Sequence, residues 1–387
     1  MKQKVVKVFF NLINYEINGH ELRDDVKNLI TEETLPALFN LSKMHDLAHL
    51  VGDALEKNGL LKEGTEGYNR FIKERNVAIY RYEQLNYEYE QICNVFEQNK
   101  INFIPLKGSV IRKFYPNSWM RTSCDIDILV KEEDLRSAID VLVKNLNYTE
   151  KQIGNHDAQL YSQNGIHLEL HYKLQSTKTK WSEILDNVWN YVIKDDACYK
   201  KQMTNEIFYF YHIAHMASHF KEGGCGVRFF LDLFILNNKL DYDSAKLQTL
   251  LEKYGLLNFY NESINLARFW FDNETPNDTT KLFEEYVLYS GMYGSIENRV
   301  IVKKKEKKGK LGYLLSRIFL PYNKLKYDYP KLQKCCILYP YYILKRFFKF
   351  LFNKKTRNDA VSELNKVVNI DSEKQKNIET LFNEINL

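Results

Sequence analysis

The segment RTSCDIDILV at residues 121–130 constrains the fold most, because it places two aspartates inside an apolar strand. Strands of this kind disfavour aspartate, and an unpaired buried carboxylate is costly. Residues i and i+2 of a strand share a face, so Asp125 and Asp127 project together while Ile126 and Ile128 face the core. Carboxylate oxygens are the ligands of hard divalent cations, so this pair predicts a metal site.

Short strands and helices alternate around this segment. The pattern predicts a strand at 101–108, a helix at 109–115, a strand at 125–130 and a helix at 131–146 with an acidic first turn. This alternation predicts a small α+β unit.

The next segment supplies a third carboxylate. Residues 158–174, AQLYSQNGIHLELHYKL, predict a β-hairpin with Asn164-Gly165 as its turn, and Glu169 stands alone among apolar neighbours. If the second strand of the hairpin pairs beside 125–130, Glu169 joins the two aspartates. Three carboxylates can hold two Mg²⁺ ions, one activating an attacking oxygen and one neutralising a leaving phosphate.

Gly108 and Ser109 lie where the first strand ends and the first helix begins. Bare backbone N–H groups at such a helix start can cradle phosphate oxygens. The order strand, Gly-Ser, helix, Asp-x-Asp strand, helix and hairpin with Glu resembles the polymerase-β-like nucleotidyltransferase superfamily. That resemblance implies that Gly-Ser holds a triphosphate and that the three carboxylates bind two metal ions.

A narrower resemblance covers 106–130. This stretch looks like a bacterial family of uncharacterised nucleotidyltransferases that carry Leu-Lys-Gly, then Tyr-Pro, then an Arg shortly before Asp-x-Asp-x-Leu-Val. ELHYKL at 169–174 resembles the third-carboxylate strand of that family. The gap from Ser109 to Asp125 is longer than in the minimal nucleotidyltransferases, which is a departure from the pattern. The matching residues are Leu106, Lys107, Gly108, Tyr115, Pro116, Arg121, Asp125, Asp127, Leu129 and Val130.

The resemblance implies an α+β fold with a polymerase-β-like core, a small mixed sheet with helices, flanked by helical regions. We expect an N-terminal helical region at 1–98 and a catalytic core at 99–178. A helical domain that completes the cleft is expected at 179–300, and a basic, aromatic-rich helical region at 301–387.

The implied activity is transfer of a nucleotidyl group from an NTP to an acceptor that the sequence does not identify. We expect two Mg²⁺ ions, with Mn²⁺ able to substitute. Asp125 and Asp127 would bind both ions, Glu169 would bind the catalytic one, and Gly108 and Ser109 would hold the β- and γ-phosphates. An envelope or polysaccharide precursor, a modified peptide, a protein side chain and RNA all stay open as acceptors.

Other polar residues near these motifs have more than one interpretation each. Lys107 and Arg121 would offset triphosphate charge, or are surface charges. His167 and His171 flank Glu169 on the same strand face. His171 would orient a carboxylate, act as a base, or serve only the structure.

The helix pattern YHIAHMASHF places His212, His215 and His219 on one face. This spacing permits a metal site, but neither a thiolate nor a carboxylate in the segment completes a ligand set, so packing near the nucleotide cleft is favoured. Arg228 and Asp232 stand at i and i+4, which favours a helix salt bridge over a phosphate contact for Arg228.

Charge is distributed unevenly along the chain. Residues 301–360 contain 17 Lys or Arg against 3 Asp or Glu, whereas the remainder contains 38 against 47. A segment this basic should meet an anionic partner. Basic and aromatic residues interleave in 338–357, which predicts an interfacial helix on an anionic membrane, with RNA as the less favoured alternative.

Two other function classes remain open: a sugar or sugar-phosphate transferase on the same fold, and a catalytically silent membrane-peripheral scaffold. The helical first 98 residues argue against the first class, and the complete carboxylate set argues against the second. Six scattered cysteines without a CxxC pair predict a reducing compartment. We find no signal-peptide pattern and expect a cytoplasmic protein, with peripheral attachment to the inner face of the membrane.

Overall fold

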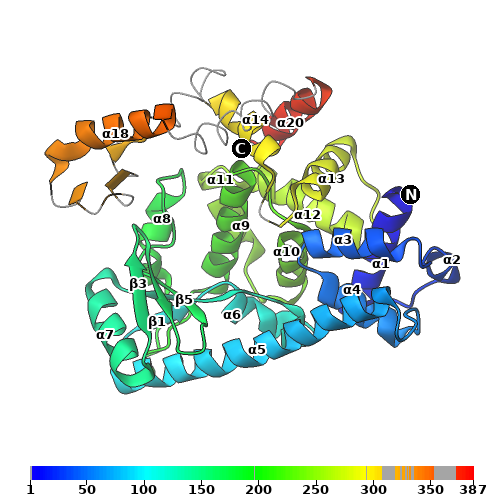
Figure 1. Cartoon of the computed structure of the whole chain (residues 1–387), viewed down its shortest axis with the longest axis horizontal. Coiled ribbons are helices and arrows are strands. Elements are labelled where there is room, and N and C mark those ends of the chain that lie inside the picture. Colours follow the sequence, from blue (N-terminus) through cyan, green and yellow to red (C-terminus); the bar gives the residue numbers. More distant parts are fainter. Residues whose placement is uncertain are drawn as a thin grey trace.

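The computed structural model of the 387-residue chain describes residues 2–195, 197–292, 294–306, 319–322, 325–326, 329, 331–332, 335–352 and 372–387. The described part is mostly helical and contains one small sheet, drawn at the left of Figure 1. This architecture confirms the expected α+β class, a small mixed sheet flanked by helices.

The sheet has five strands in the order β1-β2-β5-β4-β3. β2 and β5 run parallel, whereas the other neighbouring pairs run antiparallel. Because β5 lies between β2 and β4, the predicted hairpin sits directly beside the aspartate strand. The strands are β1 (Phe103–Pro105), β2 (Asp125–Val130), β3 (Thr149–Ile153), β4 (Asp157–Tyr161) and β5 (His167–His171).

The strand register brings the predicted carboxylates together. Asp127 lies opposite Glu169, and Asp125 lies opposite His167. The turn between β4 and β5 contains Gly165 at φ +79°, a conformation that glycine adopts without a side-chain clash. The prediction that the Glu169 strand pairs beside the aspartate strand is therefore confirmed.

The opposite face of the sheet is apolar and lies against two helices, α5 (Glu66–Gln98) and α7 (Leu135–Leu146). Side chains alternate along a strand, so the residues between the polar positions form this core. Burying one aliphatic side chain fully contributes about 1.5–3 kcal/mol. The fully buried residues of β2, β4 and β5 in this core include Ile126, Ile128, Val130, Ala158, Leu160, Leu168 and Leu170.

α5 connects the two ends of the molecule. It begins after the N-cap Thr65, whose side chain accepts a hydrogen bond from the Tyr68 N–H. It then runs along the lower edge of Figure 1, from the N-terminal helices to the sheet. Those helices are α1 (Lys2–Asn18), α2 (Asp24–Lys27), α3 (Leu35–Met44) and α4 (Ala48–Lys57).

A second and larger apolar core joins the N-terminal helices to the helices that follow the sheet. Its centre is aromatic: the ring of Phe283 contacts the rings of Phe220 and Phe230, and all three side chains are fully buried. The following helices are α8 (Ser182–Asp186), α9 (Asn205–Lys221), α10 (Val227–Lys239), α11 (Ser244–Lys253), α12 (Leu257–Phe271) and α13 (Asp278–Ser290). The expected division into four regions stays a prediction.

Short elements connect β1 to β2. The helix predicted at 109–115 is the four-residue α6 (Gly108–Ile111), followed by a 3₁₀ turn at Arg112–Phe114. Pro116 follows that turn, and proline restricts the preceding residue to extended conformations, which ends the helix. Further 3₁₀ turns lie at Ser118–Met120, Glu132–Asp134, Val188–Tyr191 and Cys336–Leu338.

The C-terminal helices are α14 (Ile296–Glu306), α18 (Tyr339–Phe352) and α20 (Ser372–Glu384). α20 joins the larger core through Phe382, which stacks on Phe220, whereas α18 lies at the upper left edge of the molecule (Figure 1). Residues 353–357 of the predicted interfacial segment lie outside the described residues. Within the described part of the chain, no helix is both long and apolar enough to span a membrane.

Candidate active site

The polar face of the sheet forms one wall of a cavity of about 920 Å³ between the sheet and helices α9 and α10. Strand alternation directs the carboxylates of β2 and the polar side chains of β5 to this face. Asp125, Asp127 and Glu169 all line the cavity, as do Lys107 and His171. We call these five residues the carboxylate cluster.

Lys107 reaches the cluster because of its backbone conformation. It follows β1 with φ +42° and ψ −118°, a strained combination for a residue with a side chain. Its Nζ donates to Asp127 Oδ1 at 2.7 Å. From the sequence, Lys107 was expected to offset triphosphate charge. In this structure Lys107 forms an ion pair with Asp127.

His171 is the second partner of Asp127. Its Nε2 lies 2.9 Å from Asp127 Oδ1 and 3.4 Å from Glu169 Oε2. An ionised carboxylate only accepts hydrogen bonds, so Nε2 carries the proton. Burial lowers the pKa of His171, but its bonds to Asp127 and Glu169 outweigh burial and raise the pKa above its usual value.

The two aspartates of β2 differ electrostatically. Burial and the neighbouring charges of Asp127 and Glu169 raise the pKa of Asp125 to about 6. Burial also opposes ionisation of Asp127, but Lys107 and His171 reverse this effect and hold the pKa of Asp127 well below its usual range. Asp127 is therefore neutralised within the protein, whereas Asp125 is not.

The carboxylate cluster fits a divalent cation. Three carboxylates face Lys107 and one histidine, which leaves excess negative charge. Ligand atoms of Asp127, Glu169 and His171 lie within 4.8 Å of one another, and so do ligand atoms of Asp125, His167 and Glu169. Within the described residues, the buried Nε2 of His167 has no hydrogen-bond partner.

Gly108 and Ser109 differ in position. Gly108 lines the cavity, and a Cβ there would lie 3.3 Å from the Ser123 Cβ, so the close packing favours glycine. Ser109 is not among the cavity-lining residues, and its backbone N–H donates to the Leu106 carbonyl. The structure therefore does not bring Ser109 together with the carboxylates.

Arg121 lines the same cavity, but its guanidinium is occupied by another partner. Its Nε and Nη2 donate to the carboxylate of Asp232 on α10 at 2.8–3.0 Å, and the hydroxyl of Tyr115 donates to the same carboxylate at 2.7 Å. All three side chains are buried. The ion pair with Arg121 outweighs burial and lowers the pKa of Asp232.

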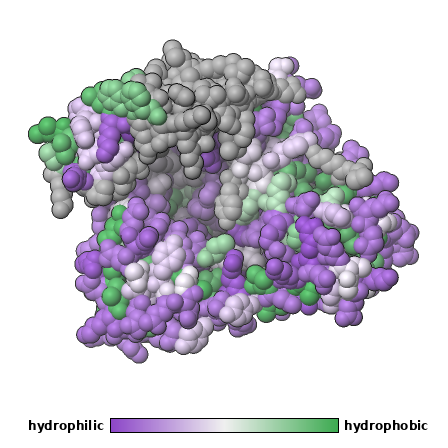
Figure 2. Space-filling view, viewed as in Figure 1, coloured by the Kyte–Doolittle hydropathy of each residue, from purple (hydrophilic) through white to green (hydrophobic). Residues whose placement is uncertain are grey.

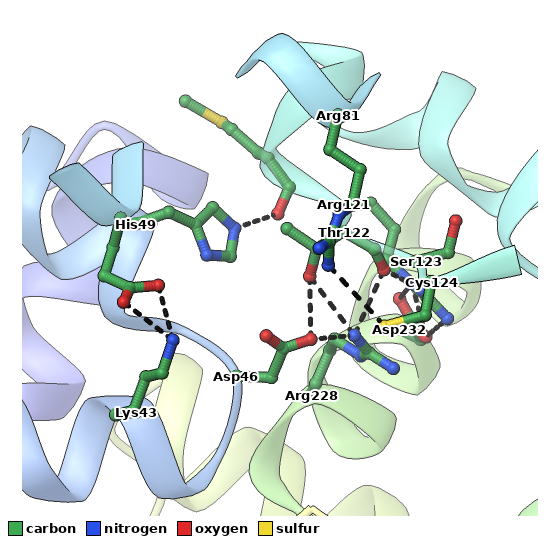
Figure 3. Close-up of polar contacts among 12 residues, drawn as sticks. Lys43, Asp46, His49, Arg81, Arg121, Thr122, Ser123, Cys124, Arg228 and Asp232 are labelled. Atoms are coloured by element: carbon green, nitrogen blue, oxygen red, sulfur yellow. Dashed lines mark hydrogen bonds and ion pairs between the residues drawn. The ribbon is translucent and has the colours of Figure 1, made fainter. Parts of the chain in front are cut away.

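Arg228 extends this arrangement (Figure 3). Its Nη1 pairs with Asp46 in the loop between α3 and α4, and it also donates to the Thr122 carbonyl at 3.1 Å. Arg228 thus has Asp46 as an ion-pair partner, while Asp232 has Arg121. We call the six residues Asp46, Tyr115, Arg121, Thr122, Arg228 and Asp232 the arginine cluster.

The α9 histidines face the cavity from the other side. His215 and His219 place their Nε2 atoms 3.3 Å apart, and both line the cavity. Burial lowers the pKa of His215, and burial lowers the pKa of His219 to about 4, so both rings are neutral near pH 7. His212 also lines the cavity, and burial lowers its pKa as well.

Sequence reasoning missed the loop that follows β5. Residues 175–180, QSTKTK, line the cavity with two lysines, Lys178 and Lys180. Tyr211 on α9 also lines it and is buried. Two lysines among hydroxyl residues, directly after the third-carboxylate strand, were the signal available in the sequence.

Comparison with known proteins gives one match. A family model described as "Uncharacterised nucleotidyltransferase" matches residues 31–272. The match runs from just before α3 to the end of α12 and includes every residue of both clusters. No curated protein and no solved structure gives a significant match.

Proposed function

Since the chain belongs to the family of uncharacterised nucleotidyltransferases, and is therefore a transferase of phosphorus-containing groups, we propose that it moves a nucleotidyl group from an NTP to an acceptor in a Mg²⁺-dependent reaction. The observation that carries this proposal is the convergence of Asp125, Asp127 and Glu169 at one wall of the cavity. In the reaction, an acceptor oxygen bonds to the α-phosphorus, the bond to the bridging oxygen breaks, and pyrophosphate leaves.

The carboxylates of Asp125, Asp127 and Glu169 would hold two Mg²⁺ ions. When bound, the ions supply charge neutralisation and an activated oxygen. The strands fix the carboxylates before substrate arrives, and positioning of this kind accounts for much of the rate in transfer reactions. Mn²⁺ can take the same ligands.

Cationic residues around the cavity would receive the triphosphate. Lys178, Lys180 and Lys221 line it together with the backbone of Gly108. Lys107 lies at the junction of phosphates and carboxylates, where it can exchange Asp127 for a phosphate oxygen. Arg121 and Arg228 would act from the arginine cluster, by fixing the wall rather than by binding phosphate.

The acceptor must lose a proton, and His215 is placed to take it. Its ring is neutral and lines the cavity beside His219, but burial lowers the pKa of both rings, so His215 would take the proton only from an acceptor that a bound ion has made more acidic. The unidentified acceptor is thus a hydroxyl or similar nucleophile. An envelope or polysaccharide precursor and a modified peptide both present such groups.

Helix α18 supports a location beside an anionic membrane. The large apolar side chains of Tyr341, Leu344, Phe348 and Phe352 are all at least half exposed and recur every three to four residues along α18. This spacing puts them on one helical face, and Figure 2 shows hydrophobic residues at the upper left, where α18 lies. An apolar face within a strongly basic region suits a surface of anionic lipid.

The test is release of pyrophosphate from NTP labelled in its γ-phosphate. Purified protein, Mg²⁺ and each NTP in turn would be incubated with a cell extract as the source of acceptor. We expect labelled pyrophosphate from one or more NTPs, and incorporation of label when the α-phosphate is labelled instead. Release of orthophosphate alone would contradict the proposal, and transfer from a labelled sugar nucleotide would replace it.

A further inference from the structure

His167 and residues of the carboxylate cluster form two groups of possible metal ligands, and the carboxylates of the two groups differ in the hydrogen bonds that they already accept. In the group of Asp127, Glu169 and His171, Lys107 and His171 both bind Asp127 Oδ1. In the group of Asp125, His167 and Glu169, the described residues offer no hydrogen bond to the Asp125 carboxylate. Glu169 of this second group still lies 3.4 Å from His171, so Asp125 is its carboxylate without a hydrogen-bonded cation among the described residues.

His167 is prepared for such a partner. It lies opposite Asp125 in the register of β2 and β5. The ring of Tyr161 stacks on its ring with centroids 4.7 Å apart and an interplanar angle of 16°, which fixes the plane of the imidazole. Its Nε2 is buried without a hydrogen-bond partner in the part of the chain that the structure describes, an arrangement that is costly unless something binds there.

We propose that His167 is a metal ligand beside Asp125 and Glu169, and that this mixed nitrogen and oxygen position selects Mn²⁺ in preference to Mg²⁺. The inference rests on the metal site of the proposed function and specifies its ion. Mg²⁺ requires near-octahedral oxygen ligands and loses its waters reluctantly. Imidazole nitrogen is a better ligand for first-row transition ions, so each nitrogen ligand shifts the preference away from Mg²⁺.

Electron paramagnetic resonance of bound Mn²⁺ tests the ligand directly. Metal-free wild-type protein would be titrated with MnCl₂, and the free-ion signal gives the affinity. Pulsed measurements on the bound ion report ¹⁴N nuclei in direct contact with it. We expect ¹⁴N coupling in the wild type and, in competition, Mn²⁺ affinity at least about tenfold above that for Mg²⁺.

Variants assign the nitrogen. His167→Gln should remove the ¹⁴N coupling and weaken Mn²⁺ binding by about tenfold, with Mg²⁺ binding changed by less than about twofold. His156→Gln is the matched control, because His156 lines the cavity beside Asp125 and Glu169 but belongs to neither ligand group. Replacing histidine in the wild type by its ¹⁵N form should change the coupling without any substitution, so the test does not depend on a variant that folds.

Two outcomes overturn the inference. Bound Mn²⁺ without ¹⁴N coupling means an all-oxygen site. Coupling that survives in His167→Gln and disappears in His171→Gln assigns the nitrogen to the other group. The proposed function is tested separately. Pyrophosphate release with Mg²⁺ supports nucleotidyl transfer whatever atoms bind Mn²⁺. Nitrogen-bound Mn²⁺ in a protein that turns over no NTP contradicts nucleotidyl transfer but leaves the role of His167 as a ligand intact.

Discussion

The arginine cluster and the carboxylate cluster are both groups of buried and half-buried charges, and only three residues of the chain separate Arg121 from Asp125. The arginine cluster pairs two guanidinium groups with two carboxylates, and the hydroxyl of Tyr115 fills a further acceptor position. The carboxylate cluster sets three carboxylates against Lys107 and a histidine. One cluster is complete within the protein, and the other has negative charge left over.

The difference separates structural charges from functional ones. A buried charge is tolerated when it is paired and hydrogen-bonded. The arginine cluster meets this condition and connects three segments that are distant in sequence: the loop at Asp46, the segment at 121–122 and α10 (Figure 3). The carboxylate cluster meets it at Asp127 and, through His171, at Glu169, so Asp125 marks the position where a cation is needed.

The largest expected effect is a loss of folding stability when the arginine cluster loses a carboxylate. Asp232→Asn removes the charge that pairs with Arg121 and leaves a buried guanidinium without a counterion. We expect the free energy of unfolding to fall by about 3–5 kcal/mol. Urea and thermal denaturation of the purified variant would measure the loss.

A double variant controls for this result. Arg121→Met with Asp232→Leu removes both charges and keeps apolar volume, so it should cost less stability than Asp232→Asn alone. A fall of less than about 1 kcal/mol in the single variant would mean that the arginine cluster is not a structural clamp.

An Asp→Asn substitution that destabilises the protein at the arginine cluster should stabilise it at the carboxylate cluster. Asp125→Asn removes a charge that burial and two neighbouring carboxylates destabilise. We expect the metal-free protein to gain about 1–3 kcal/mol at pH 7, while pyrophosphate release is lost. Thermal denaturation in a chelator and the labelled-NTP assay would measure the two changes.

Asp127 supplies the contrast within that cluster. Two like charges on one strand face repel each other, but Asp127 also accepts hydrogen bonds from Lys107 and His171. Asp127→Asn should therefore lose both transfer and stability. A stability gain at Asp127, or a stability loss at Asp125, would show that we have assigned the two roles to the wrong residues.

A smaller effect follows from pH. The pKa of Asp125 is about 6 in the folded protein and close to its usual value of 3.8 in the unfolded chain, so the folded state holds the proton more tightly. The stability from this group is fully present below about pH 4 and is lost as the pH rises through about 6. Without metal, wild type and Asp125→Asn should therefore converge in stability near pH 4 and diverge near pH 7. A difference that does not change with pH would contradict this, and saturating divalent cation should reduce the divergence.

Much of the fold and half of the candidate site could be predicted from the sequence. The shared face of the carboxylates follows from strand alternation, and the Gly165 turn predicts the pairing of β4 with β5, whereas the parallel pairing of β5 with β2 was only a hypothesis until the structure showed it. The partner of Arg121 could not be predicted, because Asp232 lies more than one hundred residues away and meets it only through helix packing. The contact of Lys107 with Asp127 depends on an unusual backbone conformation that composition does not reveal.

The smallest expected effect is on membrane binding. The positive charges of α18 are not balanced by acidic residues of the same helix, so we expect them to bind an anionic partner. Each Lys or Arg near anionic lipid contributes about 1 kcal/mol, which salt screens. Wild type should co-sediment with vesicles containing phosphatidylserine at low salt, and much less with phosphatidylcholine vesicles.

Changing Lys345, Arg346 and Lys349 together to Gln should abolish most of this binding and leave pyrophosphate release in solution unchanged. Leu344→Ser with Phe348→Ser should weaken it as well, because both side chains are at least half exposed on the apolar face. If the charge variant stops catalysis without vesicles, α18 belongs to the catalytic body, and if the wild type binds RNA but never vesicles, its basic charge serves a nucleic-acid acceptor instead.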